Sequence, residues 1–265
     1  MEYLGYLALG SVAGLVSGLF GLGGGTVIVP ILLLLFATQG VSPEIATHMA
    51  IATSLACISV TSISSIYTHY QKGAVKWPLV KLIIPGVVAG ALVGTSFFVS
   101  LEGVFLQLLL GIFLVAIGMQ MIFLRTEESD AALPGRAFLM SSGAGIGGVS
   151  ALFGVGGGMF TTPLLTHFGV KIHNAIGVAA IGGFCVALPA TIVYGSANIE
   201  AVSLPGSTLG YIFLPAWFGI IITSAPFARL GAIIAHRANA KQLKKIFGVY
   251  LFVLGVRFVW TNIAG

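Results

Sequence analysis

The sequence predicts an all-α polytopic membrane protein built from two inverted-topology repeats, and three observations lead there. Hydrophobic residues make up 57% of the chain and charged residues only 7%, which is too little polar surface to coat a soluble globule of this size. A glycine-rich motif at 14–30 recurs 133 residues later at 147–163, with ten of seventeen positions identical. Eleven of the 12 basic residues lie in alternate linkers. We therefore expect residues 1–265 to form a single transmembrane domain.

Glycine runs, prolines and charges divide each half into five apolar segments. A crossing helix needs about 20 residues, so the short second segment of each half is interpreted as a half-helix. Together with the segment before it, it forms a broken helical hairpin: a long helix, a glycine-rich break and a short half-helix. Three spanning helices follow each hairpin. The segments fall near 4–20, 26–38, 44–70, 78–100 and 103–124, then 137–153, 159–168, 174–195, 208–229 and 242–262.

A polar, helix-breaking linker separates the repeats. Repeat 1 covers about 1–125, the linker 126–136 and repeat 2 about 137–265. Other positions also match across the duplication: Pro85 matches Pro215, and Gly111, Leu114 and Gly118 match Gly248, Leu251 and Gly255.

The distribution of lysine and arginine predicts the orientation. An odd number of crossings per half places the halves in opposite orientations, and the linkers at 70–81, 125–136, 169–173 and 229–245 then fall on one side. They carry eleven basic residues, whereas the opposite linkers carry none. By the positive-inside rule, both termini are outside the cell (inner) membrane and the basic loops 70–81 and 229–245 are cytoplasmic. The net charge of +5 is scattered instead of lining one face, which excludes a nucleic-acid partner.

Catalytic and metal-binding patterns are missing from the apolar segments. Cys57 and Cys185 have no metal-ligand spacing, so we interpret them as small buried hydrophobes. The spans lack paired carboxylates, a Cys/His cluster and a Ser-His-Asp set. We therefore expect that the protein is not an enzyme and that it binds no cofactor and no metal ion.

Three stretches carry a resemblance to a known family. They are the doubled motif Gly-x-x-Ser-Gly/Ala-x-x-Gly-x-Gly-Gly-Gly-x-x-x-x-Pro, the stretch Ala46–Leu55, and Gly73-Ala74-Val75-Lys76-Trp77. The chain resembles the TauE/SafE family of membrane transporters over its full length. The resemblance implies export or uptake of sulfite, sulfoacetate or related sulfur-containing anions, and it supports roles for Thr53 and Ser54. The second half departs from the pattern, with Ile181-Gly182-Gly183 where the first has Thr-Ser-Leu.

The glycine breaks suit an oxyanion. A helix that begins in mid-membrane presents unpaired N–H groups and the positive end of its dipole, and inversion brings both helix starts to the membrane centre. The alternative is that the glycines only pack helices closely, as expected of Gly86, Gly90 and Gly94. A nucleotide-phosphate loop is disfavoured, because neither copy ends in Gly-Lys-Ser/Thr and no strand precedes it. The candidate residues at the helix starts are Gly23, Gly24, Gly25 and Thr26, and Gly156, Gly157, Gly158 and Thr161.

Three further polar features are candidates. Ser17 and Ser150 match across the repeat and either donate to substrate or bond their own helix carbonyls. His48 either carries a coupling proton or is a packed, hydrogen-bonded histidine. Seven residues of the third segment share one face, which lines a polar path or forms a hydroxyl-rich helix contact. They are Thr47, Ile51, Ser54, Ile58, Thr61, Ser65 and Thr68.

These features predict a secondary transporter of a small anion, a sulfur-containing oxyanion or organosulfonate. The anion is bound at the membrane midplane by the two glycine breaks and moved by alternating access between inverted halves. The expected partners are this small anionic substrate and the lipid bilayer, and a homo-oligomer remains open. Two alternatives keep the same glycine packing: an anion channel and a non-transporting membrane scaffold.

Overall fold

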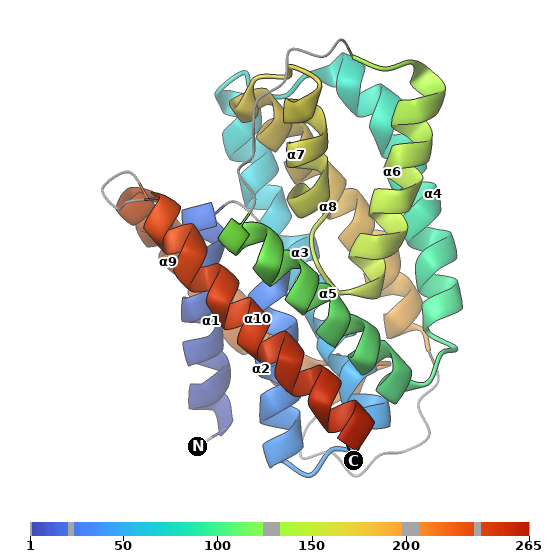
Figure 1. The fold of residues 1–265 in the computed structure, drawn as a ribbon, viewed down its shortest axis with the longest axis vertical. Helices are drawn as coiled ribbons and strands as arrows, with labels where there is room; N and C mark the ends of the chain where they lie inside the picture. Colours follow the sequence, from blue (N-terminus) through green and yellow to red (C-terminus); the bar gives the residue numbers. More distant parts are fainter. Residues whose placement is uncertain (1, 21–23, 124–132, 198–206, 236–239, 265) are drawn as a thin grey trace.

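The computed structural model describes residues 2–20, 24–123, 133–197, 207–235 and 240–264. These residues form ten helices and one two-stranded hairpin (Figure 1), which confirms the predicted all-α polytopic class. The helices are α1 (Glu2–Phe20), α2 (Gly25–Thr38), α3 (Pro43–Gln71), α4 (Trp77–Phe98), α5 (Gly103–Phe123), α6 (Arg136–Leu152), α7 (Gly158–His167), α8 (Ile172–Gly195), α9 (Leu214–Ala235) and α10 (Ala240–Ala264).

Five helices in the described part of the chain are long and apolar enough to cross a bilayer. Their mean hydropathy reaches 2.2 in α5 and α8. Together they make the chain a multi-pass membrane protein. The spans are Pro43–Gln71, Trp77–Phe98, Gly103–Phe123, Ile172–Gly195 and Lys245–Ile263.

The helix order follows the expected sequence of long helix, short helix and three further helices, twice over. α2 and α7 have 14 and 10 residues, too few for an untilted crossing. In Figure 1, α2 lies toward the same end of the molecule as both termini, whereas α7 lies toward the opposite end.

The predicted segment 208–229 is wrong at its start. Residues Thr208–Leu209 (β1) and Ile212–Phe213 (β2) form an antiparallel hairpin instead of helix. Gly210 turns the chain with a φ of 52°, a left-handed conformation that glycine adopts without steric cost. Helix α9 begins only at Leu214, and Pro215 in its first turn is tolerated because the N–H it lacks would be unpaired there.

Helix α3 forms the centre of the protein, and its residues between Ala46 and Ser59 are buried. Around it, α1 packs along α9, α6 along α4, and α5 along α10, while α8 packs against α3 itself. The α4–α6 contact is made by small residues. A Cβ at Gly86 or Gly90 would overlap the carbonyl oxygens of Met140 and Ala144, so these glycines serve the close packing that the sequence suggested.

The α5–α10 contact is reciprocal. A Cβ at Gly118 would lie 2.7 Å from the carbonyl oxygen of Gly248, and one at Gly248 would lie 3.0 Å from that of Gly118. Gly111 and Gly255 face each other in the same way, at 3.1 and 2.7 Å. Gly111 matches Gly248 and Gly118 matches Gly255 across the repeat. Exchanging the two halves therefore turns the Gly118–Gly248 contact into the Gly255–Gly111 contact. That is the contact pattern a two-fold axis generates.

Candidate functional site

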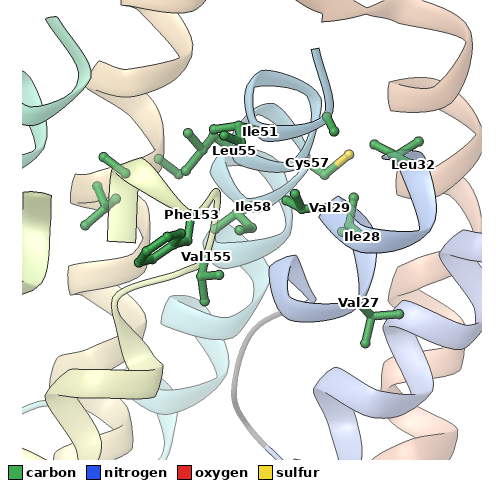
Figure 2. Packing of buried hydrophobic residues seen from close by; sticks show 14 of the residues in the cluster. Val27, Ile28, Val29, Leu32, Ile51, Leu55, Cys57, Ile58, Phe153 and Val155 are labelled. Atoms are coloured by element: carbon green, nitrogen blue, oxygen red, sulfur yellow. The ribbon is translucent and has the colours of Figure 1, made fainter. Parts of the chain in front are cut away.

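The two glycine breaks, far apart in the sequence, meet beside α3. A Cβ at Gly25, the first residue of α2, would overlap the carbonyl oxygen of Gly154 and lie 2.9 Å from the Cα of Val155. A Cβ at Gly154 would in turn lie 2.8 Å from a methyl of Val29. Figure 2 shows Val29 of α2 and Val155 of the second break on either side of Ile58 of α3. The described part of the first break therefore packs directly on the second.

Both half-helices start without a side-chain cap. Their N-cap residues are Gly24 and Gly157, neither of which has a side chain to offer to the first turn. The amides of Ile28 and Thr161 reach the N-cap carbonyls at 2.9 Å each, so the amides of the first helical residues lie outside the helical ladder. A helix start buried in this way favours an anionic ligand, because its N–H groups and dipole both point there.

Close packing explains some of the motif glycines and not others. At Gly25 a side chain would collide with backbone, as described above. At Gly157 the nearest atom to an added Cβ is the carbonyl carbon of Gly182, at 3.5 Å, and at Gly156 it is a methyl of Ile58, at 3.7 Å. The φ angles of Gly24 and Gly157 are −67° and −55°, which suit any residue. Glycine at position 157 is therefore required neither by packing nor by backbone conformation, and at Gly24 an added Cβ would require only the Ile28 side chain, 3.2 Å away, to shift.

Three buried hydroxyl groups lie in the segments that form the breaks. Thr26 is in the first turn of α2, Ser150 in the last turn of α6, and Thr161 in the first turns of α7. Each is 1% exposed or less, and none of the three Oγ atoms has a hydrogen-bond partner among the described residues. The alternative that Ser150 bonds its own helix is thus not observed, and all three remain free to donate to a ligand.

Two glycines of α8 lie beside the start of α7, where a methyl group would make ordinary van der Waals contacts. A Cβ at Gly182 would lie 3.8 Å from Thr161 Oγ1, and one at Gly183 would lie 4.0 Å from the amide nitrogen of Gly157. The glycines that replace the Thr-Ser-Leu pattern in the second half therefore face the amides and a hydroxyl of the second break.

Thr53 and Ser54 bond to the protein instead of standing free. Ser54 Oγ donates to the carbonyl oxygen of Gly154 at 2.7 Å, which ties α3 to the second break. Thr53 Oγ1 accepts a hydrogen bond from the amide of Phe213 at 3.0 Å, which ties α3 to the hairpin. Both side chains are buried. Their role in this structure is to position the second break and the hairpin.

Three of the remaining hydroxyls on that face of α3 bond to carbonyl groups of α3 itself. Thr47 donates to the Pro43 carbonyl, Thr61 to that of Cys57, and Thr68 to that of Ser64, each at 2.9 or 3.0 Å. Hydroxyls bonded to their own helix in this way are satisfied without solvent or ligand.

The structure separates His48 from the breaks. Ser54 is six residues further along α3 than His48, which is about 9 Å at 1.5 Å per residue. His48 instead contacts Tyr211 and Tyr194, with ring centroids 5.0 and 6.3 Å away. Neither tyrosine could be predicted as a neighbour of His48, because no periodicity or motif connects the end of α8 and the hairpin to α3.

For the other predicted candidates among the described residues, the structure gives burial but no specific contact. Ser17 is half-buried near the end of α1, and Gly158 is half-buried at the start of α7. Gly23 lies outside the described residues. Cys57 is buried and Cys185 half-buried, both as free thiols, and the described residues contain no group of three His, Cys, Asp or Glu side chains able to hold a metal ion.

Comparisons with known proteins agree over nearly the whole chain. A family model described as sulfite exporter TauE/SafE matches residues 6–258. A probable membrane transporter protein of Haemophilus influenzae is 31% identical over 253 residues, which cover 94% of this chain and 95% of the relative. A probable membrane transporter of Methanocaldococcus jannaschii is 26% identical, covering 94% and 92%, and YunE of Bacillus subtilis is 27% identical, covering 99% of both. No solved structure matches the chain.

Proposed function

The chain belongs to the sulfite exporter TauE/SafE family, and from this premise we propose that it is a secondary transporter of a small sulfur-containing anion. Its curated relatives are described as probable membrane transporters, so the protein is a membrane transporter and not an enzyme. Sulfite, sulfoacetate and similar oxyanions or organosulfonates are the substrates that this premise favours.

One observation carries the proposal: two buried helix starts with glycine N-caps lie beside α3, and the segments that form them are in contact. Amide groups from Gly24 to Thr26 and from Gly156 to Gly158 would bind the anion. The buried hydroxyls of Thr26, Ser150 and Thr161 would add donors. Helix dipoles and amides would supply the positive potential that lysine or arginine supplies in other anion sites.

The transport mechanism that we propose is alternating access by two inverted repeats. The reciprocal α5–α10 glycine contact supports a two-fold relation between the halves. The pairing of α1 with α9 and of α6 with α4 supports it too, because these pairs exchange under the repeat. Rocking of one half against the other would expose the midplane site to each side in turn. In this arrangement both termini are outside the cell membrane and the basic loops are cytoplasmic.

Uptake into proteoliposomes tests the proposal. Purified protein is tested against sulfite, sulfate, thiosulfate, sulfoacetate, methanesulfonate and acetate. We expect saturable uptake of at least one sulfur-containing anion, with faster exchange when the same anion is preloaded inside. Flux that rises linearly with concentration would favour a channel. A response only to cations or neutral solutes would reject an anion transporter.

A further inference from the structure

A second polar cluster lies away from the glycine breaks, between α3, α8 and the hairpin. The His48 ring from α3 packs at a tilt on the Tyr211 ring, with centroids 5.0 Å apart. The Tyr194 ring from α8 meets both edge-on, at 6.3 Å from His48 and 6.1 Å from Tyr211. His48 is 4% exposed and Tyr194 is fully buried. Three separate elements therefore enclose one imidazole and one phenol.

The hairpin covers this cluster and is hydrogen-bonded to α8 through Tyr211, just before β2, and to α3 through Phe213, the last residue of β2. The amide of Tyr211 donates to the carbonyl oxygen of Tyr194 at 3.1 Å, and the amide of Phe213 donates to Thr53 Oγ1 at 3.0 Å. The Phe213 ring packs edge-on against Tyr6 and Phe36, with centroids 5.8 and 5.6 Å away. The hairpin therefore closes the cluster from one side.

Two polar atoms of the cluster lack a partner among the described residues: His48 Nε2 and the Tyr194 hydroxyl. His48 Nδ1 lies 3.0 Å from the Glu44 carbonyl oxygen. Because a carbonyl only accepts, Nδ1 carries the proton, and Nε2 of the neutral ring then holds a free lone pair. An unpaired acceptor and an unpaired hydroxyl in a buried cluster are costly unless a ligand or a proton reaches them.

We propose that His48 and Tyr194 form an outer site that binds the transported anion together with one proton. This inference rests on the proposed function and adds a second site to it. A proton from the external solution bonds to His48 Nε2, the ring becomes an imidazolium, and its new N–H donates to the anion. The Tyr194 hydroxyl donates a second hydrogen bond. Histidine suits this role because its charge changes between pH 5 and 8.

The charges around His48 are compatible with a site of this kind. Tyr194 faces it from α8 and Tyr211 from the hairpin, and both are uncharged as phenols. On its own helix, the nearest carboxylate is Glu44, whose Oε2 accepts a hydrogen bond from the Gly103 amide at 2.9 Å at the start of α5. Among the described residues, the ring contacts of His48 are those with Tyr194 and Tyr211. In this proposal the proton itself supplies the positive charge that binds the anion.

Calorimetric titration of the full-length protein in detergent tests this inference. The probes are methanesulfonate and sulfate, whose own charges stay constant between pH 5.5 and 8. Titrations at pH 7.5 in buffers of different ionisation enthalpy count the protons taken up with each anion. We expect about one proton per anion, and an affinity that rises up to about tenfold for each pH unit of acidification.

Three variants locate the proton. His48→Gln should abolish proton uptake and flatten the pH dependence, whereas His69→Gln, near the other end of the same helix, should leave both unchanged. Tyr194→Phe should weaken anion binding several-fold and leave the proton count near one. His48→Asn, which keeps a donor toward the Glu44 carbonyl, replaces His48→Gln if that variant unfolds.

The outcomes separate this inference from the proposed function. Proton uptake that persists in a folded His48 variant would overturn the proton site. Binding by the wild-type protein with no proton uptake and no pH dependence would also overturn it, while leaving the anion transporter in place. A wild-type protein that binds neither probe and transports no anion in the uptake panel would reject the proposed function itself.

Discussion

Alanine substitutions at Gly157 and Gly25 should distinguish a glycine needed for ligand binding from one needed for packing. At Gly157 an added Cβ meets nothing closer than 3.5 Å, and the φ of −55° suits alanine. Gly157→Ala should therefore fold, and it should raise stability by about 0.4–1 kcal/mol, because alanine loses less backbone entropy on folding. At Gly25 the added Cβ overlaps the Gly154 carbonyl oxygen and approaches the Val155 Cα to 2.9 Å. Backbone atoms cannot rotate away, so Gly25→Ala should cost about 1–3 kcal/mol or more.

Gly157→Ala should weaken anion transport although it raises stability. A methyl group at the start of α7 would stand between the anion and one backbone amide. A hydrogen bond to a charged group contributes about 1.5–3 kcal/mol, so its loss should weaken anion affinity about tenfold to a hundredfold. Gly24→Ala, where the nearest atom is the flexible Ile28 side chain at 3.2 Å, should behave in the same way.

The assay pairs thermal unfolding, followed by size-exclusion chromatography of heated samples, with initial uptake rates in proteoliposomes at several concentrations of the best substrate. Gly86→Ala is the packing control, because its Cβ would overlap the Met140 carbonyl oxygen away from the breaks. A Gly157→Ala protein that transports with wild-type affinity would refute the site. A Gly157→Ala protein that unfolds, together with a Gly25→Ala protein as stable as wild type, would contradict the packing described at both glycines.

Three further predictions follow from single contacts or from the proposed orientation. Ser54→Ala leaves a buried carbonyl oxygen without its 2.7 Å donor and should lower stability by about 1–3 kcal/mol, measured by thermal unfolding; an unchanged melting temperature would contradict this role. Thr161→Val removes a hydroxyl that bonds to no described residue, so it should weaken anion binding without loss of stability, measured by titration and melting together; equal affinity would exclude this hydroxyl as a donor. Single cysteines at Lys72 and Lys245 should react with a membrane-impermeant maleimide from the cytoplasmic face, and one at Ser100 from the outside, in a background without the native cysteines; labelling of the first two from opposite faces would reject the inverted repeat.

The helices could be predicted from the sequence because lipid imposes long apolar runs and glycine, proline and charge interrupt them. The predicted segment 103–124 matches α5 to within one residue, and 174–195 matches the end of α8. The hairpin at 208–213 could not be predicted in this way. The hairpin is held by the Tyr194 carbonyl of α8 and the Thr53 hydroxyl of α3, contacts that no local pattern reveals, so the apolar run Tyr211–Leu214 reads as the beginning of a helix.

The positions of the two helix breaks could be predicted from the sequence, but the packing around them could not. The repeated motif pointed to both helix breaks, but it treats Gly24 and Gly25 alike, whereas an added Cβ would collide with backbone at Gly25 and meet the flexible Ile28 side chain, at 3.2 Å, at Gly24. Which of two adjacent glycines is structural depends on the neighbouring chain, which a sequence motif does not describe. His48 was a candidate because it is an ionisable residue within a predicted span, and only the tertiary structure places it with Tyr194 and Tyr211.

The two breaks are not equivalent, and this asymmetry indicates where the anion would bind first. On the α3 side, the Ser54 hydroxyl is already bonded to Gly154. On the α8 side, Gly182 and Gly183 leave space of van der Waals width beside Thr161 and the Gly157 amide. A serine or leucine there, as in the first half, would fill that space and take the donors. We therefore expect the start of α7, more than the start of α2, to hold the anion in the conformation described here. In the inverted conformation, the start of α2 would open in its place, so that an asymmetric sequence still serves a symmetric cycle.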